Sequence, residues 1–295
     1  MPAARRPETA GVVLWRAGDH GGQPQVGLLD SAGGPSLPTR PAGRGPGGAL
    51  TAAVALARLL VPAPGPLGPR LLTGTARTRG RVFWPVEVRG PSPHPEGRDE
   101  RHDSIRWVPG DEAVDAAASG ADRRVLRAFL ADPSPRRPVV IVRHARAGKR
   151  GSWAGPDEER PLDRRGRAQA AALVDVLAGY QVERIHSSAA RRCRETVTPL
   201  AEAVDLPIDE DRLLGEVAAL EDPASASATL VELVQRPGRA VICGQRKSLD
   251  IALPALLEAL GVTGPVTVPG KGGLLVLHVP ESGAGALVEG VEPQA

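Results

Sequence analysis

The sequence is poor in cysteine, in aromatic residues and in long apolar runs. Its two cysteines, Cys193 and Cys243, form no CxxC motif and no Cys/His cluster, so neither a disulfide framework nor a zinc site is indicated. No apolar run approaches the roughly eighteen residues that a transmembrane helix needs, and the N-terminal segment lacks the apolar centre of a signal peptide. These absences predict a cytoplasmic protein with no membrane partner.

Charge is nearly balanced, with 37 Lys and Arg residues against 34 Asp and Glu residues, which argues against a nucleic-acid polymer as partner. The distribution is uneven, because the stretch between Asp30 and Glu87 contains arginine but neither Asp nor Glu. Any site built from that stretch therefore has few carboxylates to draw on.

A length of 295 residues predicts two domains. The first half shows short strand patterns around an Ala/Leu-rich helix at 49–61, and it closes with an amphipathic helix at 121–132. The Pro-rich segment 133–138 is the expected linker. We therefore expect one domain at 1–132 and a second at 139–295.

In the second half, apolar strands alternate with helices, which predicts a mainly parallel sheet covered on both faces. Ligands of such sheets bind beyond the carboxyl ends of the strands. Guanidinium, imidazole, hydroxyl and amide groups follow the predicted strand ends, and guanidinium groups match phosphate oxygens. Taken singly, each of these groups is typical of a solvated strand end or a charged helix face, so their joint spacing carries the prediction of a phosphate site. The groups are Arg143, His144, Ser188, Arg192 and Gln245.

This joint pattern resembles the histidine phosphatase (phosphoglycerate mutase-like) superfamily. "VRHA" supplies Arg143 and His144, and "SSAARRCRET" supplies Arg192 at the matching spacing. "RPLDRRGRAQA" (160–170) resembles a segment of the short phosphohistidine-phosphatase branch. The resemblance implies an α/β/α domain in which His144 accepts a phosphoryl group, Arg143 and Arg192 stabilise its charge, and no metal takes part.

The resemblance also implies supporting roles. Ser188 and Gln245 would bind phosphate, and Glu216 in "RLLGEV" would donate a proton to the leaving group, although Glu216 fits an ordinary surface residue equally well. Ala145 stands where the superfamily usually has glycine, and Gln245 stands where it usually has a second histidine. From these departures we expect slower chemistry or a narrower substrate range.

The first half resembles a Nudix domain, an α/β/α sandwich with a mixed sheet, in its strand order, its "LP" followed by a Gly-rich loop, and its Ala-rich helix. A Nudix-like domain ahead of a histidine phosphatase domain is the layout of the actinobacterial MutT-type two-domain proteins. Members of that family hydrolyse oxidised guanine nucleotides and related nucleoside polyphosphates. The resemblance therefore implies a small phosphorylated substrate such as a nucleotide.

The Nudix motif itself is degenerate. Its reaction needs Mg²⁺ held by glutamates on one helix, whereas the helix at 49–61 offers Thr51 and Arg58 but no carboxylate. Acidic residues at 87 and within 96–103 are a weak substitute. We expect no cofactor, with Mg²⁺ needed only if this domain proves active.

Aromatic residues of the first half have two open interpretations. Trp15, Phe83 and Trp84 are placed to stack on a base or simply to pack in the core. Core packing is the commoner use of strand aromatics.

Three functions stay open at this point. The first is a metal-independent phosphohydrolase that works through a phosphohistidine. The second is a Nudix-type nucleoside polyphosphate pyrophosphohydrolase with unusual metal ligands, and the third is a non-catalytic phosphate-binding or scaffold protein. The organic part of the substrate is not indicated, and a homo-oligomer is compatible with the sequence.

Overall fold

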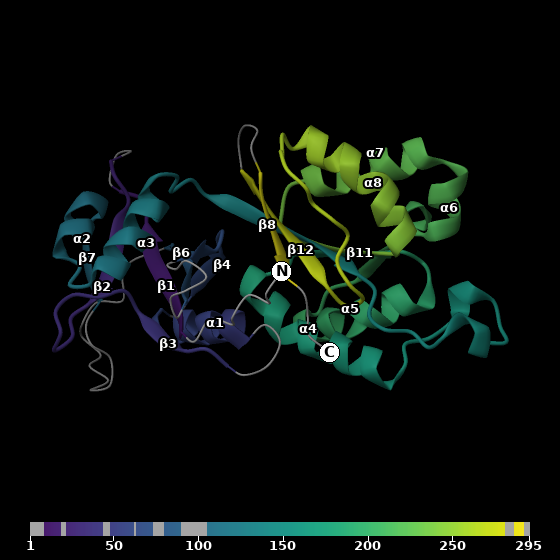
Figure 1. Cartoon of the computed structure of the whole chain (residues 1–295), viewed down its shortest axis with the longest axis horizontal. Coiled ribbons are helices and arrows are strands. Elements are labelled where there is room, and N and C mark those ends of the chain that lie inside the picture. Colours follow the sequence, from purple (N-terminus) through teal and green to yellow (C-terminus); the bar gives the residue numbers. More distant parts are fainter. Residues whose placement is uncertain are drawn as a thin grey trace. The chain divides into compact units, whose positions relative to one another are not determined.

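The computed structural model describes residues 9–18, 22–43, 48–61, 63–72, 80–89, 105–280 and 286–291. The acidic residues of the 96–103 segment lie outside the described residues. The chain forms two compact units, Met1–Pro135 and Arg136–Ala295, and each is an α/β unit with its own sheet (Figure 1). Among the described residues, no helix is both long and apolar enough to cross a membrane.

The first unit contains a mixed sheet, as the sequence predicts. Its strands run in the order β4-β6-β1-β2-β7, with β3 pairing with β1 and β5 pairing with β6. The pairing of β1 with β6 is parallel and the other pairings are antiparallel. The strands are β1 (Thr9–Arg16), β2 (Gln25–Leu29), β3 (Thr39–Pro41), β4 (Pro64–Leu67), β5 (Leu71–Leu72), β6 (Arg81–Val88) and β7 (Ile105–Pro109).

The side chains of β1 alternate between the two faces of the sheet, and those on one face pack against a helix. Val13 and Trp15 of β1 share a core cluster with Phe129 of α3, and the Trp15 and Phe129 ring centroids lie 5.6 Å apart. Val12 and Leu14 point to the opposite face, because successive strand side chains alternate. The helices are α1 (Gly48–Leu60), α2 (Gly110–Ala116) and α3 (Gly120–Leu130).

The aromatic residues of this unit are core residues. Trp15, Phe83 and Trp84 are all buried, and Phe83 has no exposed surface. Of their two interpretations, core packing is therefore the one that the structure supports.

The second unit contains a mainly parallel sheet, also as predicted, in the order β10-β9-β11-β8-β12-β13. Strands β10, β9, β11 and β8 are parallel to one another, whereas β12 runs antiparallel to β8 and to β13. The strands are β8 (Arg136–Arg143), β9 (Arg184–Ser187), β10 (Ile208–Glu210), β11 (Ala240–Gly244), β12 (Leu274–Pro280) and β13 (Leu287–Val291).

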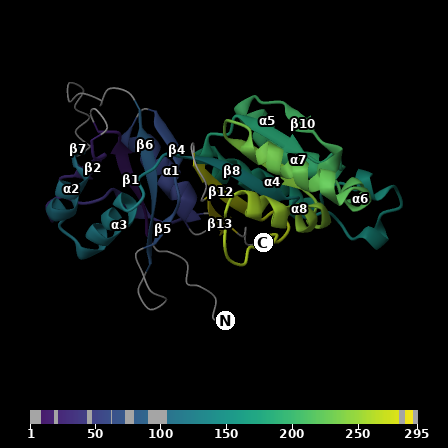
Figure 2. The same ribbon diagram turned by 90° about the horizontal axis from the view of Figure 1, so that it is seen from above.

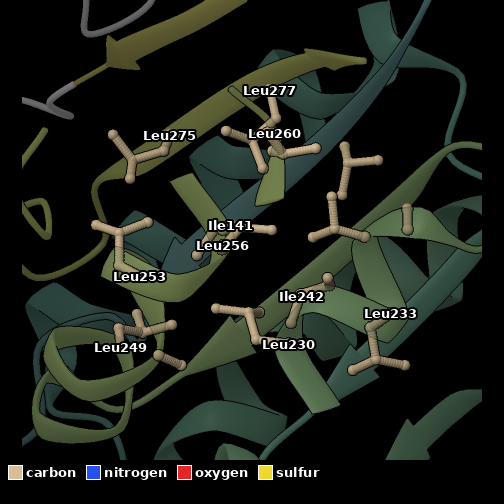
Figure 3. Packing of buried hydrophobic residues seen from close by; sticks show 14 of the residues in the cluster. Ile141, Leu230, Leu233, Ile242, Leu249, Leu253, Leu256, Leu260, Leu275 and Leu277 are labelled. Atoms are coloured by element: carbon tan, nitrogen blue, oxygen red, sulfur yellow. The ribbon is translucent and has the colours of Figure 1, made fainter. Parts of the chain in front are cut away.

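Helices cover both faces of this sheet (Figure 2). Ile141 and Ile242 pack against Leu230, Leu253 and other leucines of α7 and α8 in one large core cluster (Figure 3). Cys243, the residue after Ile242, contacts Cys193 of α5 on the other face. The helices are α4 (Arg164–Leu177), α5 (Arg191–Val204), α6 (Glu216–Glu221), α7 (Pro223–Gln235) and α8 (Arg246–Ala259).

The predicted linker 133–138 extends too far, because β8 already begins at Arg136. Arg136 pairs with Pro280 and Pro138 with His278 of β12. Strand β11 joins β8 only from Val139 onward, so the missing N–H of Pro138 costs no hydrogen bond on that side.

Candidate active site

His144 follows the last residue of β8, at the sheet edge where parallel strands β9, β8 and β11 all end. Its backbone N–H donates to the carbonyl oxygen of Gly244 at the end of β11, at 3.2 Å. Its Nδ1 lies 2.7 Å from the carbonyl oxygen of Ala145. Because a carbonyl oxygen only accepts, Nδ1 carries the proton, which leaves a lone pair on Nε2.

The imidazole of His144 is held neutral. Burial, foremost, and the nearby charges of Arg192, Arg143 and Lys271 lower its pKa to about 3, although the hydrogen bond to Ala145 acts in the opposite direction. An imidazole can act as a nucleophile only when it is uncharged, and the lowered pKa keeps His144 uncharged at neutral pH. A buried neutral base among cations is suited to receive an anionic group.

Arg192 is fixed in the first turn of α5. Its guanidinium donates to Asp157 twice, to the carbonyl oxygen at 2.5 Å and to a carboxylate oxygen at 3.0 Å. Arg192 is 3% exposed, and its buried Nε has no hydrogen-bond partner within the described residues. A buried donor of this kind is costly unless a ligand completes it, so Arg192 has donor capacity left for an anion.

Thr196 connects Arg192 to the residue after His144. Its hydroxyl donates to the carbonyl oxygen of Arg192 at 2.6 Å and accepts the backbone N–H of Ala145 at 2.9 Å. Thr196 is almost fully buried. This bridge holds the start of α5 and the end of β8 in a fixed relation.

The "RPLDRRGRAQA" segment supports the loop that carries His144. Asp163 caps α4 by accepting the N–H of Gly166, and Gln169 accepts the N–H of Arg146 at 2.9 Å. A side chain at Gly166 would put its Cβ 1.9 Å from the carbonyl oxygen of Arg146, so only glycine permits this approach. Leu162 packs with Ala145 and Ala170 in a small buried cluster. The motif is therefore a scaffold for the site.

Ala145 fits its position without strain. Its φ is not positive, so the usual glycine is not required for backbone reasons, and its side chain is buried. The replacement of glycine is structurally neutral here.

Ser188, Gln245 and Glu216 meet at the same sheet edge. The amide oxygen of Gln245 accepts the backbone N–H of Glu216, which leaves the amide NH₂ of Gln245 as its donor group. The hydroxyl oxygen of Ser188 accepts the N–H of Ala190 at 3.3 Å. A Cβ at Gly215 would lie 3.3 Å from that hydroxyl and 3.8 Å from the Gln245 amide oxygen, so the two side chains are close together.

The carboxylate of Glu216 is paired with Lys247 at 2.6 Å, and its side chain is 23% exposed. The hydrogen bond between Glu216 and Gln245 uses the backbone N–H of Glu216. The structure therefore brings Glu216 beside the site through its main chain, while its carboxylate is committed to a lysine.

Two residues near the site were not predicted. Asp157 begins a single 3-10 turn (Asp157–Glu159), which is too short for a periodic sequence pattern to mark it. Lys271 is one of only three lysines in the chain and stands in the run "GKGG", a signal that could have been noticed. Both contribute charge close to the predicted residues.

The Nudix-like magnesium chemistry has no ligands on α1. Its residues are Ala, Val, Leu, Gly, Thr and Arg, and its buried face is wholly apolar. In the described part of the chain, no three His, Cys, Asp or Glu side chains come together as a metal site would require. Within the described residues, α1 therefore offers no carboxylate that would fit Mg²⁺.

Comparison with known proteins identifies the class of the second unit. Residues 139–228 match the histidine phosphatase superfamily (branch 1), so the C-terminal region carries a histidine phosphatase domain.

The chain is also similar to an 8-oxo-(d)GTP phosphatase of Mycolicibacterium smegmatis, with 38% identity over 176 residues. The match covers 60% of this chain and 52% of that protein, so the chain spans about half the length of this relative.

Two solved structures are similar to part of the chain. The protein histidine phosphatase SixA complexed with tungstate has 22% identity and a TM-score of 0.41, over 53% of this chain and 97% of that chain. A mycobacterial glucosyl-3-phosphoglycerate phosphatase has 20% identity and a TM-score of 0.37, over 48% of this chain and 90% of that chain.

Proposed function

We propose that the chain is a metal-independent phosphohydrolase that transfers a phosphoryl group from a small phosphorylated substrate to His144 and then to water. The observation that carries this proposal is the state of His144: neutral, with its proton on Nδ1, and close to three cationic side chains. An uncharged nitrogen nucleophile needs that tautomer, and the charge of a phosphoryl group needs those cations.

The reaction has two displacements. In the first, the lone pair of His144 Nε2 forms the P–N bond while the bond from phosphorus to the leaving oxygen breaks and the leaving group keeps its electron pair. The proton stays on Nδ1, which donates to the carbonyl oxygen of Ala145. In the second, water attacks phosphorus, the P–N bond breaks, and Nε2 recovers its lone pair. The phosphate that leaves carries the oxygen of the water molecule, and the protons of that molecule go to the phosphate and the solvent. Arg143 and Arg192 stabilise the phosphoryl oxygens in both steps, with Ser188 and the Gln245 amide as neutral donors.

Glu216 is the proposed proton donor for leaving groups that need one. Its carboxylate lies 2.6 Å from the Lys247 ammonium, so this ion pair must open before the carboxyl group can pass a proton to a leaving group. A phosphate leaving group departs readily as an anion, since its second ionisation lies near pH 6. The arrangement therefore suits a phosphoanhydride better than an alkyl phosphate ester.

We propose a nucleotide as the substrate class. The name of the M. smegmatis relative supports this choice, and we further propose that residues 1–132 are a degenerate Nudix-like domain. In this proposal the first unit has lost Nudix catalysis, because α1 supplies no carboxylate, and it serves to bind nucleotide or to stabilise the chain.

The testing experiment measures phosphate release from nucleoside di- and triphosphates and from phosphohistidine, with Mg²⁺ or with EDTA. Wild type is compared with His144→Ala. Activity that resists EDTA and disappears in the variant supports the proposal. Activity that needs Mg²⁺ and survives in the variant indicates a Nudix-type enzyme, and binding without release indicates a phosphate-binding protein.

A further inference from the structure

Lys271 is held beside His144 by the backbone on either side of it. The N–H of Gly272 donates to the carbonyl oxygens of Arg143 and His144, at 3.0 and 3.1 Å. The carbonyl oxygen of Gly273 accepts the N–H of Arg143 at 3.0 Å. The residues that follow Lys271 therefore form a clamp on the end of β8, and the position of Lys271 relative to His144 is fixed.

A second connection ties this loop to α4. The side-chain amide of Gln169 donates to the carbonyl oxygen of Lys271 at 3.3 Å, and its oxygen accepts the N–H of Arg146. Gly272 has a φ of +73°, and an added Cβ would lie 3.1 Å from the Gln169 side chain. Glycine at position 272 therefore allows this loop to form hydrogen bonds with both the end of β8 and Gln169 of α4.

The Lys271 ammonium lies near several positively charged side chains, and no carboxylate of the described residues pairs with it. Partial burial, foremost, and the charges of Arg143, Arg160 and Arg146 lower its pKa, against the opposing charge of Asp163. The carboxylate of Asp163 is already bonded to Arg146. Within the described residues the ammonium makes no hydrogen bond and no ion pair, so a bound anion would relieve the repulsion among these cations.

Lys271 is also more exposed to solvent than Arg143 and Arg192. His144 and Arg192 are 6% and 3% exposed, and Arg143 is half-buried, whereas Lys271 is exposed. A phosphoryl group on His144 lies among the deeper groups. The cation at the solvent side is placed for negative charge that extends beyond that group.

We propose that Lys271 binds the phosphate that adjoins the transferred phosphoryl group, so that the enzyme selects substrates with two or more consecutive phosphates. This inference rests on the proposed function at His144. Lysine provides a compact charge with rotatable donors, which suits a flexible phosphate chain.

The experiment compares two probes that differ by one phosphate. Binding of inorganic phosphate and of methylenediphosphonate, whose bridging carbon resists hydrolysis, is measured by calorimetry on the full chain. The variants are Lys271→Met, the charge-conserving Lys271→Arg, and Lys149→Met, which removes an exposed lysine from another loop and matches the change in net charge.

Lys271→Met is expected to weaken diphosphonate binding about 10- to 100-fold, the range for loss of one charged hydrogen bond, and to leave phosphate binding nearly unchanged. Lys271→Arg retains most of the affinity, and Lys149→Met behaves as wild type. An equal loss for both probes, or no loss, overturns the role of Lys271 while the function at His144 stands. If wild type binds neither probe, the inference also fails, and turnover lost in His144→Ala tests the proposed function separately.

Discussion

Arg192 holds Asp157 through two hydrogen bonds, one to its carbonyl oxygen at 2.5 Å and one to its carboxylate at 3.0 Å. Although burial acts against it, hydrogen bonding to Arg160 and the charge of Arg192 hold the pKa of Asp157 below its usual value. Asp157 is therefore ionised, and its two hydrogen bonds fix the Arg192 guanidinium, which belongs to the proposed phosphate site. Its role is positioning, since no contact places it on the reacting atoms.

This pairing predicts a graded response to substitution at position 157. Asp157→Ala is expected to lower kcat/KM by about 10- to 100-fold, because a misplaced charge at the transferred group is worth that much. Asp157→Asn loses less, because its amide oxygen still accepts from Arg192. Steady-state kinetics on both variants provide the test, and equal losses in Ala and Asn variants would contradict a role in orientation.

The buried hydroxyl of Thr196 is predicted to stabilise the folded chain. Thr196→Val leaves the buried N–H of Ala145 without its acceptor, which costs about 1–3 kcal/mol of unfolding free energy. Thr196→Ser keeps the hydroxyl and should retain most of this stability. Urea denaturation measures both variants. A Val variant as stable as wild type would show that the bridge contributes nothing.

Two buried histidines predict that stability falls with acidification. Burial, foremost, lowers the pKa of His144 and of His278 to about 3, far below the usual 6.5. Unfolded histidines take up protons below pH 6.5 whereas the folded ones do not, so stability is full above pH 6.5. It then falls by about 1.4 kcal/mol per pH unit for each histidine as pH drops toward 3.

Denaturation curves between pH 8 and pH 5 test this slope. His278→Gln is expected to remove the part that comes from position 278, even if its stability at pH 8 is lower. A wild-type unfolding free energy that does not change from pH 8 to pH 5 would contradict neutral buried histidines.

The two cysteines are predicted to be unreactive in the folded chain. Both thiols are free and buried, and burial, foremost, with the hydrogen bond to Cys193 raises the pKa of Cys243 well above its usual value. Because the thiolate is the nucleophile, alkylating reagents should label neither residue until the chain is denatured. Mass spectrometry after brief iodoacetamide treatment distinguishes the two states, and rapid labelling of the folded chain would refute the prediction.

Glu216 predicts a dependence on the leaving group. Glu216→Gln removes a proton donor, which is worth about 100-fold or more when an alkoxide must leave. Anhydride substrates should lose little, because phosphate departs as an anion. Rates on an alkyl phosphate and on a nucleoside diphosphate give the comparison, and the same loss on both would remove the proton-donor role.

Much of the second unit follows from its sequence. The apolar run that ends at Arg143 predicts that β8 is a central strand of the sheet. The alternation of strands and helices predicts parallel neighbours, so the strand ends Ser187 and Gly244 lie at the same edge of the sheet as Arg143. What could not be predicted depends on contacts across long separations. Asp157 reaches Arg192 from a single 3-10 turn between β8 and α4. Lys271 comes close to His144 through the backbone hydrogen bonds of Gly272 and Gly273. The start of β8 at Arg136 was missed because Pro138 suggests a linker, whereas the unpaired side of the strand accommodates it.

The central claim is that His144 carries the phosphoryl group. Wild type and His144→Ala are mixed with a ³²P-labelled substrate that wild type hydrolyses, quenched within one turnover in the presence of EDTA, and treated with acid or alkali before peptide mapping. We predict an acid-labile, alkali-stable label on the peptide that contains His144, and neither label nor turnover in the variant. Turnover without any label, or a label and full activity that persist in His144→Ala, would contradict the account.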